Sequence, residues 1–548
     1  MASGGRIVAK MLKGQGVRHV FTLCGLHVAD IYAGCVDEGV AVVDTRHEQA
    51  AVHAADAYAR LTRNRGVAVV TAGPGVTDAV TGVANAQAAS SPVLLIGGAA
   101  PTSTRSRGAL QEIEQVALFR PITKWAESVP SSEVLPSYLA KAFRTALSGR
   151  PGPVFLEVPW DVLNGTVDDA DLPRGYLTAA RPAGDPAYVR LAAAALAGAA
   201  RPVVVAGSSV WWDDAAEGLA RLADRLAAPV YLNGAGRGSL PPGHPSSLHL
   251  TRKAALADAD VVLVLGTPLD FRLDYGEGIG RAATLVQVDA DPTEIGRNRG
   301  ADVGIQGDTR LVVDQLLEAL GPAPAAGPGA AFLAAMRAAE AVKATSLAAQ
   351  EADAGVPIHH SRLAAEVSDF ANAPGRDPIF VADGGNFVAM AAKSIRLPGP
   401  GRWLDPGPLG CLGVGAPFAI AAKLLHPERL VVVLQGDGAF GFNGFDYETA
   451  VRFGLPMVVV VGNDAGWGQI RLPQVAIYGE DRSPATRLAA TRYDRVVEAF
   501  GGWGAHVTRP EDIRPALERA AASGTVACVN VEIDPDAPAK SGMMGYAI

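Results

Sequence analysis

The feature that most constrains this chain is the repeated alternation of short β-branched runs with longer, alanine-rich stretches. Apolar runs of about four to eight residues suit buried strands, and the longer stretches between them suit helices. Parallel sheets produce this alternation because each strand needs a crossover connection, usually a helix, before the next one. We therefore predict an α/β protein built from doubly wound parallel sheets.

Two segments rich in Pro and Gly divide the alternation into three blocks. One covers residues 161–186, and the other, at 321–330, reads GPAPAAGPGA. Such compositions are typical of linkers, and 548 residues exceed the usual size of one domain. We predict three consecutive doubly wound parallel-sheet domains, at residues 1–160, 187–320 and 331–548.

Charge and hydropathy exclude some partners. The chain has 48 basic and 56 acidic residues and no Lys/Arg run, so we expect no nucleic-acid partner. Its apolar runs are strand-sized, and the N-terminus has no signal-peptide pattern, so we expect no membrane partner. The expected location is the cytoplasm.

The third block contains the strongest motif. The strand run LVVVLQ leads into Gly436-Asp437-Gly438, and the run MVVVVG leads into Asn463-Asp464. Carboxyl ends of parallel strands face a common ligand crevice, which brings these side chains together. Glycines let the backbone approach a phosphate, and hard oxygen ligands suit Mg²⁺. A lone Asp between glycines also occurs in ordinary turns, so the prediction depends on the pairing of the two strand ends.

This GDG…N pattern resembles the motif of the thiamine diphosphate family that includes acetolactate synthase, benzaldehyde lyase, oxalyl-CoA decarboxylase and 2-hydroxyacyl-CoA lyase. The resemblance covers the whole chain and is strongest over 17–130 and 378–500. It implies a pyrimidine-binding first domain, a central domain and a diphosphate-binding third domain. The implied cofactors are thiamine diphosphate and Mg²⁺.

The implied metal site departs from the family pattern at one position. Aligning the strand ends places Asp464, rather than Asn463, where relatives usually carry an Asn ligand. Asp is also a good Mg²⁺ ligand. The implied protein ligands are the carboxylates of Asp437 and Asp464 and the carbonyl of Gly466.

The resemblance also implies a set of cofactor-binding residues in the third domain. The turn at Asp383–Asn386 would hold diphosphate, the Gly410 carbonyl would accept from the 4′-amino group, and Leu412 would hold the cofactor bent. Trp467 would line the pocket for a second substrate or pack under the metal loop. The full implied set is Gly384, Gly385, Asn386, Gly410, Leu412, Gly436, Gly438, Ala439, Phe440 and Trp467.

Three residues of the first block are the expected catalytic groups. Glu48, in Arg46-His47-Glu48, matches the family glutamate that binds N1′ of the cofactor, and a dry site would keep it protonated. Its alternative role is to stabilise a helix N-terminus. His27 matches a His of benzaldehyde lyase and would move protons near neutral pH, or be a structural His. Gln111 matches a Gln that would hold the substrate carbonyl.

The resemblance implies a lyase or carboligase that acts on 2-oxo acids or 2-hydroxy ketones, most similar to acetolactate synthase. The alternative is a 2-hydroxyacyl-CoA lyase or oxalyl-CoA decarboxylase, with an acyl-CoA substrate, because the stretch 436–444 resembles that branch. A non-catalytic cofactor-binding relative is a further alternative, which Glu48, Asp437 and Asp464 argue against. Cofactors in this family lie between subunits, so we expect a homodimer or homotetramer.

The central block leaves its ligand open. Relatives hold FAD, ADP or neither there, and Gly207, Gly266, Asp289 and Asp308 sit at expected strand ends where a nucleotide could bind. No GxGxxG fingerprint follows the first strand, so a purely structural domain is equally consistent. The tail at 540–546 is expected either to fold over the site or to be a mobile terminus.

Overall fold

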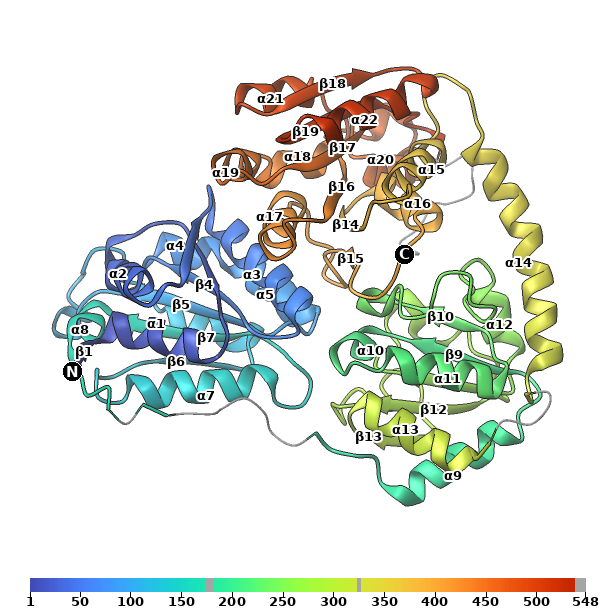
Figure 1. Cartoon of the computed structure of the whole chain (residues 1–548), viewed down its shortest axis with the longest axis horizontal. Helices are drawn as coiled ribbons and strands as arrows, with labels where there is room; N and C mark the ends of the chain where they lie inside the picture. The colour runs from blue at the N-terminus through green and yellow to red at the C-terminus, as the bar shows by residue number, and fades with distance from the viewer. Residues whose placement is uncertain (171, 174–180, 323–326, 538–548) are drawn as a thin grey trace.

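The computed structural model describes residues 1–170, 172–173, 181–322 and 327–537, which leaves the tail at 540–546 outside the described residues. Three parallel sheets, each flanked by helices, follow one another along the chain (Figure 1). The first lies in the blue unit, the second in the green unit and the third in the orange and red unit. This arrangement confirms the predicted three-domain α/β fold.

The first domain is a six-stranded parallel sheet in the order β3-β2-β4-β5-β7-β6. Its strands are β2 (His19–Thr22), β3 (Ala41–Asp44), β4 (Gly66–Val70), β5 (Val93–Ala99), β6 (Trp125–Ser128) and β7 (Val154–Pro159). Its helices are α1 (Gly4–Gly14), α2 (Ala29–Glu38), α3 (Glu48–Thr62), α4 (Pro74–Asp78), α5 (Val80–Ala88), α6 (Gln115–Phe119) and α7 (Leu135–Leu147). The chain then continues through α8 (Trp160–Asn164) to β8 (Thr166–Val167), which pairs with β1 (Ala2–Ser3). By packing, the unit therefore extends beyond residue 160.

The central domain is a five-stranded parallel sheet in the order β10-β9-β11-β12-β13. Its strands are β9 (Pro202–Ala206), β10 (Val230–Leu232), β11 (Val261–Leu265), β12 (Thr284–Asp289) and β13 (Val303–Gln306). Its helices are α9 (Pro186–Ala197), α10 (Ser208–Trp212), α11 (Ala216–Leu226), α12 (Arg252–Asp258) and α13 (Thr309–Leu320). The long helix α14 (Ala330–Glu351) leads to the third domain, but Phe332, Leu333 and Met336 near its start pack in the central core.

The third domain is a six-stranded parallel sheet in the order β15-β14-β16-β17-β19-β18. Its strands are β14 (Pro378–Asp383), β15 (Trp403–Leu404), β16 (Leu430–Gly436), β17 (Met457–Asn463), β18 (Trp503–Val507) and β19 (Val526–Glu532). Its helices are α15 (His360–Ala371), α16 (Asn386–Ser394), α17 (Gly415–Leu425), α18 (Asp437–Asn443), α19 (Asp446–Arg452), α20 (Gly468–Tyr478), α21 (Tyr493–Ala499) and α22 (Ile513–Ala522).

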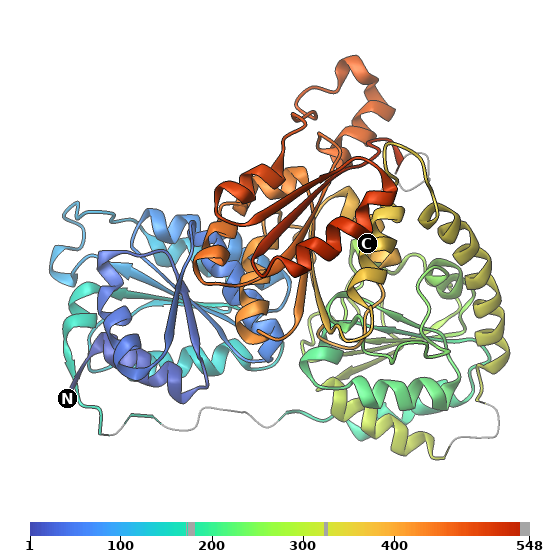
Figure 2. The ribbon, with the colours of Figure 1, turned by 45° about the horizontal axis from the view of Figure 1, so that its top comes forward.

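The first and third domains share a hydrophobic core. Helix α3 lies beside α17 (Figures 1 and 2). Small residues of the two helices belong to the same hydrophobic core. Beside this contact Arg60 forms a buried ion pair with Asp56 and donates to the Asp405 carbonyl at 2.6 Å. The two domains are therefore fixed relative to each other within one chain. In the described part of the chain, no helix combines the length and apolarity needed to cross a bilayer.

Candidate active site

Two carboxylates meet at the carboxyl ends of adjacent strands in the third domain. Asp437 follows β16, Asp464 follows β17, and their carboxyl groups lie within hydrogen-bonding reach of each other. The Gly466 N–H donates to Asp437 Oδ2 at 3.0 Å. Burial raises the pKa of both carboxyl groups, and the charge of Asp437 raises the pKa of Asp464 further. Among the described residues neither has a salt bridge to a cation, so an acid pair with this donor set fits a divalent ion such as Mg²⁺.

The side chain of Asn463 makes different contacts from that of Asp464. Its Nδ2 donates to Asn530 Oδ1 at 3.1 Å and to the Thr491 carbonyl at 3.0 Å. Its Oδ1 accepts from the Ala465 N–H at 3.1 Å. Successive side chains of a strand point to opposite faces, so only one of these two residues can reach Asp437. The structure brings Asp464 to Asp437, as the strand-end alignment predicts.

The turn after β14 presents an open backbone and an unpaired donor. Asn386 begins α16, and its buried Nδ2 has no hydrogen-bond partner among the described residues. A Cβ at Gly468 would lie 3.3 Å from that Nδ2, which places Asn386 beside the Asp464 loop. Gly385 has φ +91° and open space where a Cβ would be. A helix N-terminus with a free buried donor suits a diphosphate oxygen.

Asp383 holds the loop that contains Gly410 and Leu412. Its carboxylate accepts from the N–H groups of Gly413 and Gly415, both at 2.9 Å. Leu412 lies directly against Gly384, where a side chain would collide with it. The sequence analysis included Asp383 in the diphosphate turn but did not predict that its carboxylate would hold this loop. Burial raises its pKa to about 7.

The side chains near the acid pair differ in what they contact, as seen for Trp467, Ala439 and Phe440. The Trp467 ring covers Gly438, where a Cβ would lie 2.6 Å from a ring carbon. Ala439 and Phe440 are buried in α18, and the Phe440 ring packs with Tyr493 at 4.8 Å between centroids. Their side chains therefore serve the core, and any ligand contact would come from their backbone.

Glu48 is a buried acid at the start of α3. The His47 side chain caps this helix by accepting from the Gln49 N–H at 3.1 Å. Glu48 is 6% exposed, and burial raises its pKa, with a further contribution from the charge of Asp78. A Cβ at Gly75 would lie 3.1 Å from Glu48 Oε1, so the glycine makes room for the carboxyl group. This environment favours the protonated acid.

His47 and Asp78 also make Glu48 part of a possible metal cluster. The three residues bring potential ligand atoms within 4.8 Å of one another. The His47 Nδ1 is already used by the helix cap, however, and both neighbours are largely in contact with solvent. The cluster therefore does not support a second metal site, and its two neighbours act on the Glu48 pKa in opposite directions.

His27 and Gln111 line the same edge of the first sheet. His27 Nδ1 lies 3.1 Å from Thr71 Oγ1, and burial lowers the pKa of the imidazole, which favours the neutral ring. Gln111 has φ +63° and packs against Gly73, the residue directly before α4. In the described structure, no hydrogen bond orients the Gln111 side chain.

Gln115, which the sequence analysis missed, ties three strand ends together. Its Oε1 accepts from the Gly73 N–H at 2.8 Å, and its Nε2 donates to the Gly98 carbonyl at 3.0 Å. The same Nε2 donates to Glu157 Oε2 at 2.9 Å. Gly98 touches His27, so this buried amide fixes the surroundings of both His27 and Gln111. A glutamine in a short helix gives no signal in a single sequence.

One chain presents two separate groups of candidate residues. Over the described ranges, no hydrogen bond or ion pair joins Glu48, His27 or Gln111 to the acid pair of the third domain. The domains touch elsewhere: Arg452 pairs with Asp44 at 2.8 Å, for example.

Comparisons with known proteins cover all three domains. Residues 2–118 match the thiamine pyrophosphate enzyme N-terminal TPP binding domain, 189–316 its central domain and 383–531 its C-terminal TPP binding domain. A probable acetolactate synthase of Mycobacterium bovis is 39% identical over 97% of this chain and 96% of its own length. The 2-hydroxyacyl-CoA lyase 2 of Homo sapiens is 38% identical over 93% and 86%, and that of Caenorhabditis elegans 36% over 95% and 87%.

Proposed function

We propose, from the premise that the chain belongs to the thiamine pyrophosphate enzyme family, that this enzyme is a thiamine diphosphate- and Mg²⁺-dependent C–C lyase or carboligase. Its substrates would be 2-oxo acids or 2-hydroxy ketones. The observation that carries the proposal is the buried acid pair of Asp437 and Asp464, which has no cationic partner among the described side chains. Two buried carboxylates in contact are costly without a cation between them.

The third domain would bind the charged end of the cofactor. Asp437, Asp464 and the Gly466 carbonyl would hold Mg²⁺. Gly436 would leave room for phosphate oxygens, whereas the space beside Gly438 is taken by the Trp467 ring. Asn386 would donate its free Nδ2 to the diphosphate, where Gly385 keeps the backbone open and Gly384 makes room for Leu412. The cofactor supplies the carbanion chemistry that makes or breaks a bond next to a carbonyl.

The first domain would supply the acid and the proton carriers. A protonated Glu48 would hold the N1′ atom of the aminopyrimidine, while Leu412 supports the ring from the third domain. His27, neutral at pH 7, would move a proton at the substrate oxygen, and Gln111 would hold that oxygen. Thr71 orients His27 through its contact with Nδ1.

We also propose that two copies of the chain complete each site. Leu26 and Leu110 are 79% and 78% exposed at the first-domain half-site, and Phe442 is 52% exposed at the third-domain half-site. Large exposed apolar side chains at both half-sites suit a protein interface. Mixing inactive Glu48→Gln and Asp437→Asn chains should restore about a quarter of wild-type activity, because random dimers regain one intact site in half of the pairs. If the mixture recovers no activity, Glu48 and Asp437 belong to a site within one chain.

The substrate test is direct. We expect purified protein with pyruvate, Mg²⁺ and thiamine diphosphate to form acetolactate, and a cofactor-free sample to form none. The relatives named 2-hydroxyacyl-CoA lyase 2 favour a second candidate, cleavage of a 2-hydroxyacyl-CoA. Cofactor binding with cleavage of that thioester and no acetolactate would select the second function. Cofactor binding with neither product would contradict both.

A further experiment tests whether the central domain binds a nucleotide. Asp308 pairs with Arg181 at 2.8 Å at the carboxyl edge of this sheet, near Asp213. A bound FAD would give the purified protein a visible flavin spectrum, and a bound ADP would be released on denaturation. A protein that releases neither would have a structural central domain.

A further inference from the structure

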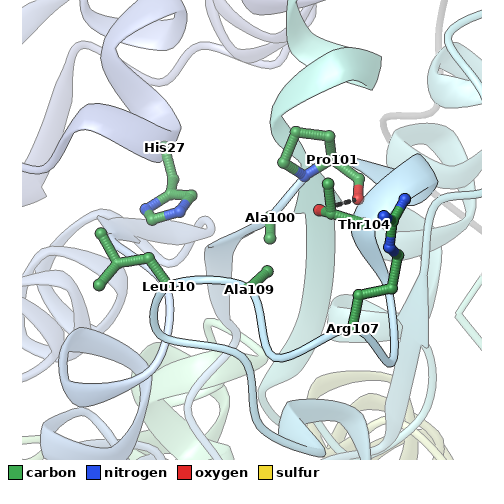
Figure 3. A pocket seen from close by; sticks show the side chains of 7 residues that line it. All are labelled: His27, Ala100, Pro101, Thr104, Arg107, Ala109 and Leu110. Atoms are coloured by element: carbon green, nitrogen blue, oxygen red, sulfur yellow. Dashed lines mark hydrogen bonds between the residues drawn. The ribbon is translucent and has the colours of Figure 1, made fainter.

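An open hollow of about 460 Å³ lies beside His27, at the loop that follows β5 (Figure 3). Ala100, Pro101, Ala109 and Leu110 give it an apolar lining, whereas its polar groups belong to His27, Thr104 and Arg107. This volume is in the range of small-molecule sites. None of the residues that line it carries a carboxylate, so Arg107 gives the hollow a positive charge.

Arg107 differs from the neighbouring Arg105 in its contacts. Arg105 donates to Ser128 Oγ at 3.0 Å and to Glu157 Oε1 at 2.8 Å, which fixes it in the strand-end network. Over the described residues, the Arg107 guanidinium has no hydrogen bond or ion pair. The Thr104 hydroxyl donates to the Pro101 carbonyl at 2.8 Å, so it is already satisfied (Figure 3). Arg107 is therefore the group of the hollow that remains available to an anion.

We propose that this hollow binds the anionic group of the substrate through Arg107, while the substrate carbonyl lies at His27. The apolar lining between these residues would hold a carbon spacer, so the substrate class is a carbonyl compound with an oxyanion at a distance from its carbonyl. A terminal carboxylate and the phosphates of a coenzyme A thioester share this chemistry, and a guanidinium binds both in a bidentate manner. This inference rests on the proposed function, because it takes His27 as the residue beside the reacting carbonyl.

Matched acceptor substrates test the assignment. With pyruvate as the donor, kcat/KM is measured for 6-oxohexanoate and for hexanal, which have six carbons each and differ in the terminal carboxylate. A 2-hydroxyacyl-CoA is measured in parallel. Arg107→Met should lower kcat/KM for an anionic substrate about 10- to 100-fold more than for hexanal, the effect of losing a charge-assisted pair. Arg107→Lys should recover part of the loss.

The two anionic substrates distinguish the source of the charge. A selective loss with 6-oxohexanoate assigns the hollow to a carboxylate, and a selective loss with the thioester assigns it to the phosphates. Arg120→Met is the matched control, since Arg120 is exposed, lies outside the hollow and has no ion pair in the described structure. An equal loss with hexanal, or no loss with either anion, would overturn the proposal.

A binding measurement keeps the inference separate from the proposed function. Phenylglyoxal modifies free guanidinium groups, and mass spectrometry locates the adducts without any need for turnover or cofactor. We expect adipate or coenzyme A to protect Arg107 from modification but not Arg120. If the anions protect Arg107 in a protein that shows no activity, the hollow binds anions and the proposed reaction is wrong. If Arg107 is modified equally with and without each anion, the hollow does not bind anions through Arg107.

Discussion

The first domain orders its strands β3-β2-β4-β5-β7-β6, and the third domain orders its strands β15-β14-β16-β17-β19-β18. When the strands are counted within each domain, leaving aside β1 and β8, both sheets have the order 2-1-3-4-6-5. Both therefore reverse direction between their first and third strands, where open α/β sheets usually bind ligands. The two domains nevertheless place different chemistry at that point.

The difference lies in the residues that follow equivalent strands. The third strand of the first domain leads to Thr71 and Gly73, which support His27 and Gln111. The third strand of the third domain leads to Asp437, which meets Asp464. The first domain offers the shielded acid Glu48, whereas the third offers a pair of acids with no cationic partner among the described side chains. A shared backbone arrangement thus positions ligands, and a few side chains decide which part of a ligand is bound.

The largest effect should come from Glu48, the shielded acid at the start of α3. We expect Glu48→Gln to lower kcat about 10²- to 10⁴-fold, because an amide cannot donate the acid proton in the same way. Thermal unfolding should be little changed. Glu217→Gln is the matched control, since Glu217 also occupies the first turn of a helix, α11, but lies on the surface of the central domain. Normal turnover of Glu48→Gln would remove Glu48 from the mechanism.

The main effect of changing the acid pair should be on the affinity for the metal. Asp437→Asn should weaken Mg²⁺ or Mn²⁺ binding more than about tenfold, since it removes one charged ligand. Asn463→Ala should instead destabilise the protein, because Asn463 bonds Asn530 and Thr491. Calorimetric titration with Mn²⁺ and thermal unfolding separate the two effects. If Asn463→Ala lost metal binding while its fold stayed intact, Asn463 would have the role of a metal ligand and not a structural one.

The acid pair should also give the metal-free protein a pH-dependent stability. Burial and the charge of Asp437 raise the pKa of Asp464 from its usual 3.8 to about 8. Its folded form then holds a proton that the unfolded form has lost, so the stabilisation is complete below about pH 4 and is lost as pH rises to about 8. Each pKa unit is worth about 1.4 kcal/mol.

Denaturation curves with EDTA at low and high pH measure this effect. The free energy of unfolding should fall between about pH 5 and pH 8, and Mg²⁺ should restore it most at the higher pH. Asp464→Asn should flatten the dependence. A metal-free protein that is equally stable at both pH values would contradict the pairing.

The smallest effect should come from the amide that supports the first-domain edge. Gln115→Leu should cost about 1 kcal/mol of stability, because it leaves the Gly73 N–H and the Gly98 carbonyl without their partner. It should also lower kcat, since His27 and Gln111 lose their support. A retained pH profile of kcat would separate a positioning role from a catalytic one. Unchanged stability would show that water replaces the amide.

The sequence predicted the interior strands better than the edge strands. Runs such as VVVL in β16 are apolar throughout because both faces of a central parallel strand are buried. No apolar run of strand length marks β6, β13, β15 or β18, each of which lies at an edge of its sheet. Their sequences, such as WAES and WGAHV, mix polar and apolar residues, because an edge strand is only partly covered. Hydropathy alone cannot separate such segments from loops.

The sequence by itself determined the fold class, the family and the order of residues at each strand end, including Asp464 in place of the usual Asn. These are local properties, set by periodicity and by which residue follows a strand. Only the tertiary structure decided that Asp383 holds the Leu412 loop, that Gln115 joins three strand ends and that Arg107 faces the hollow beside His27. Those contacts join segments far apart in the chain, and a single sequence contains no signal for which distant groups will meet.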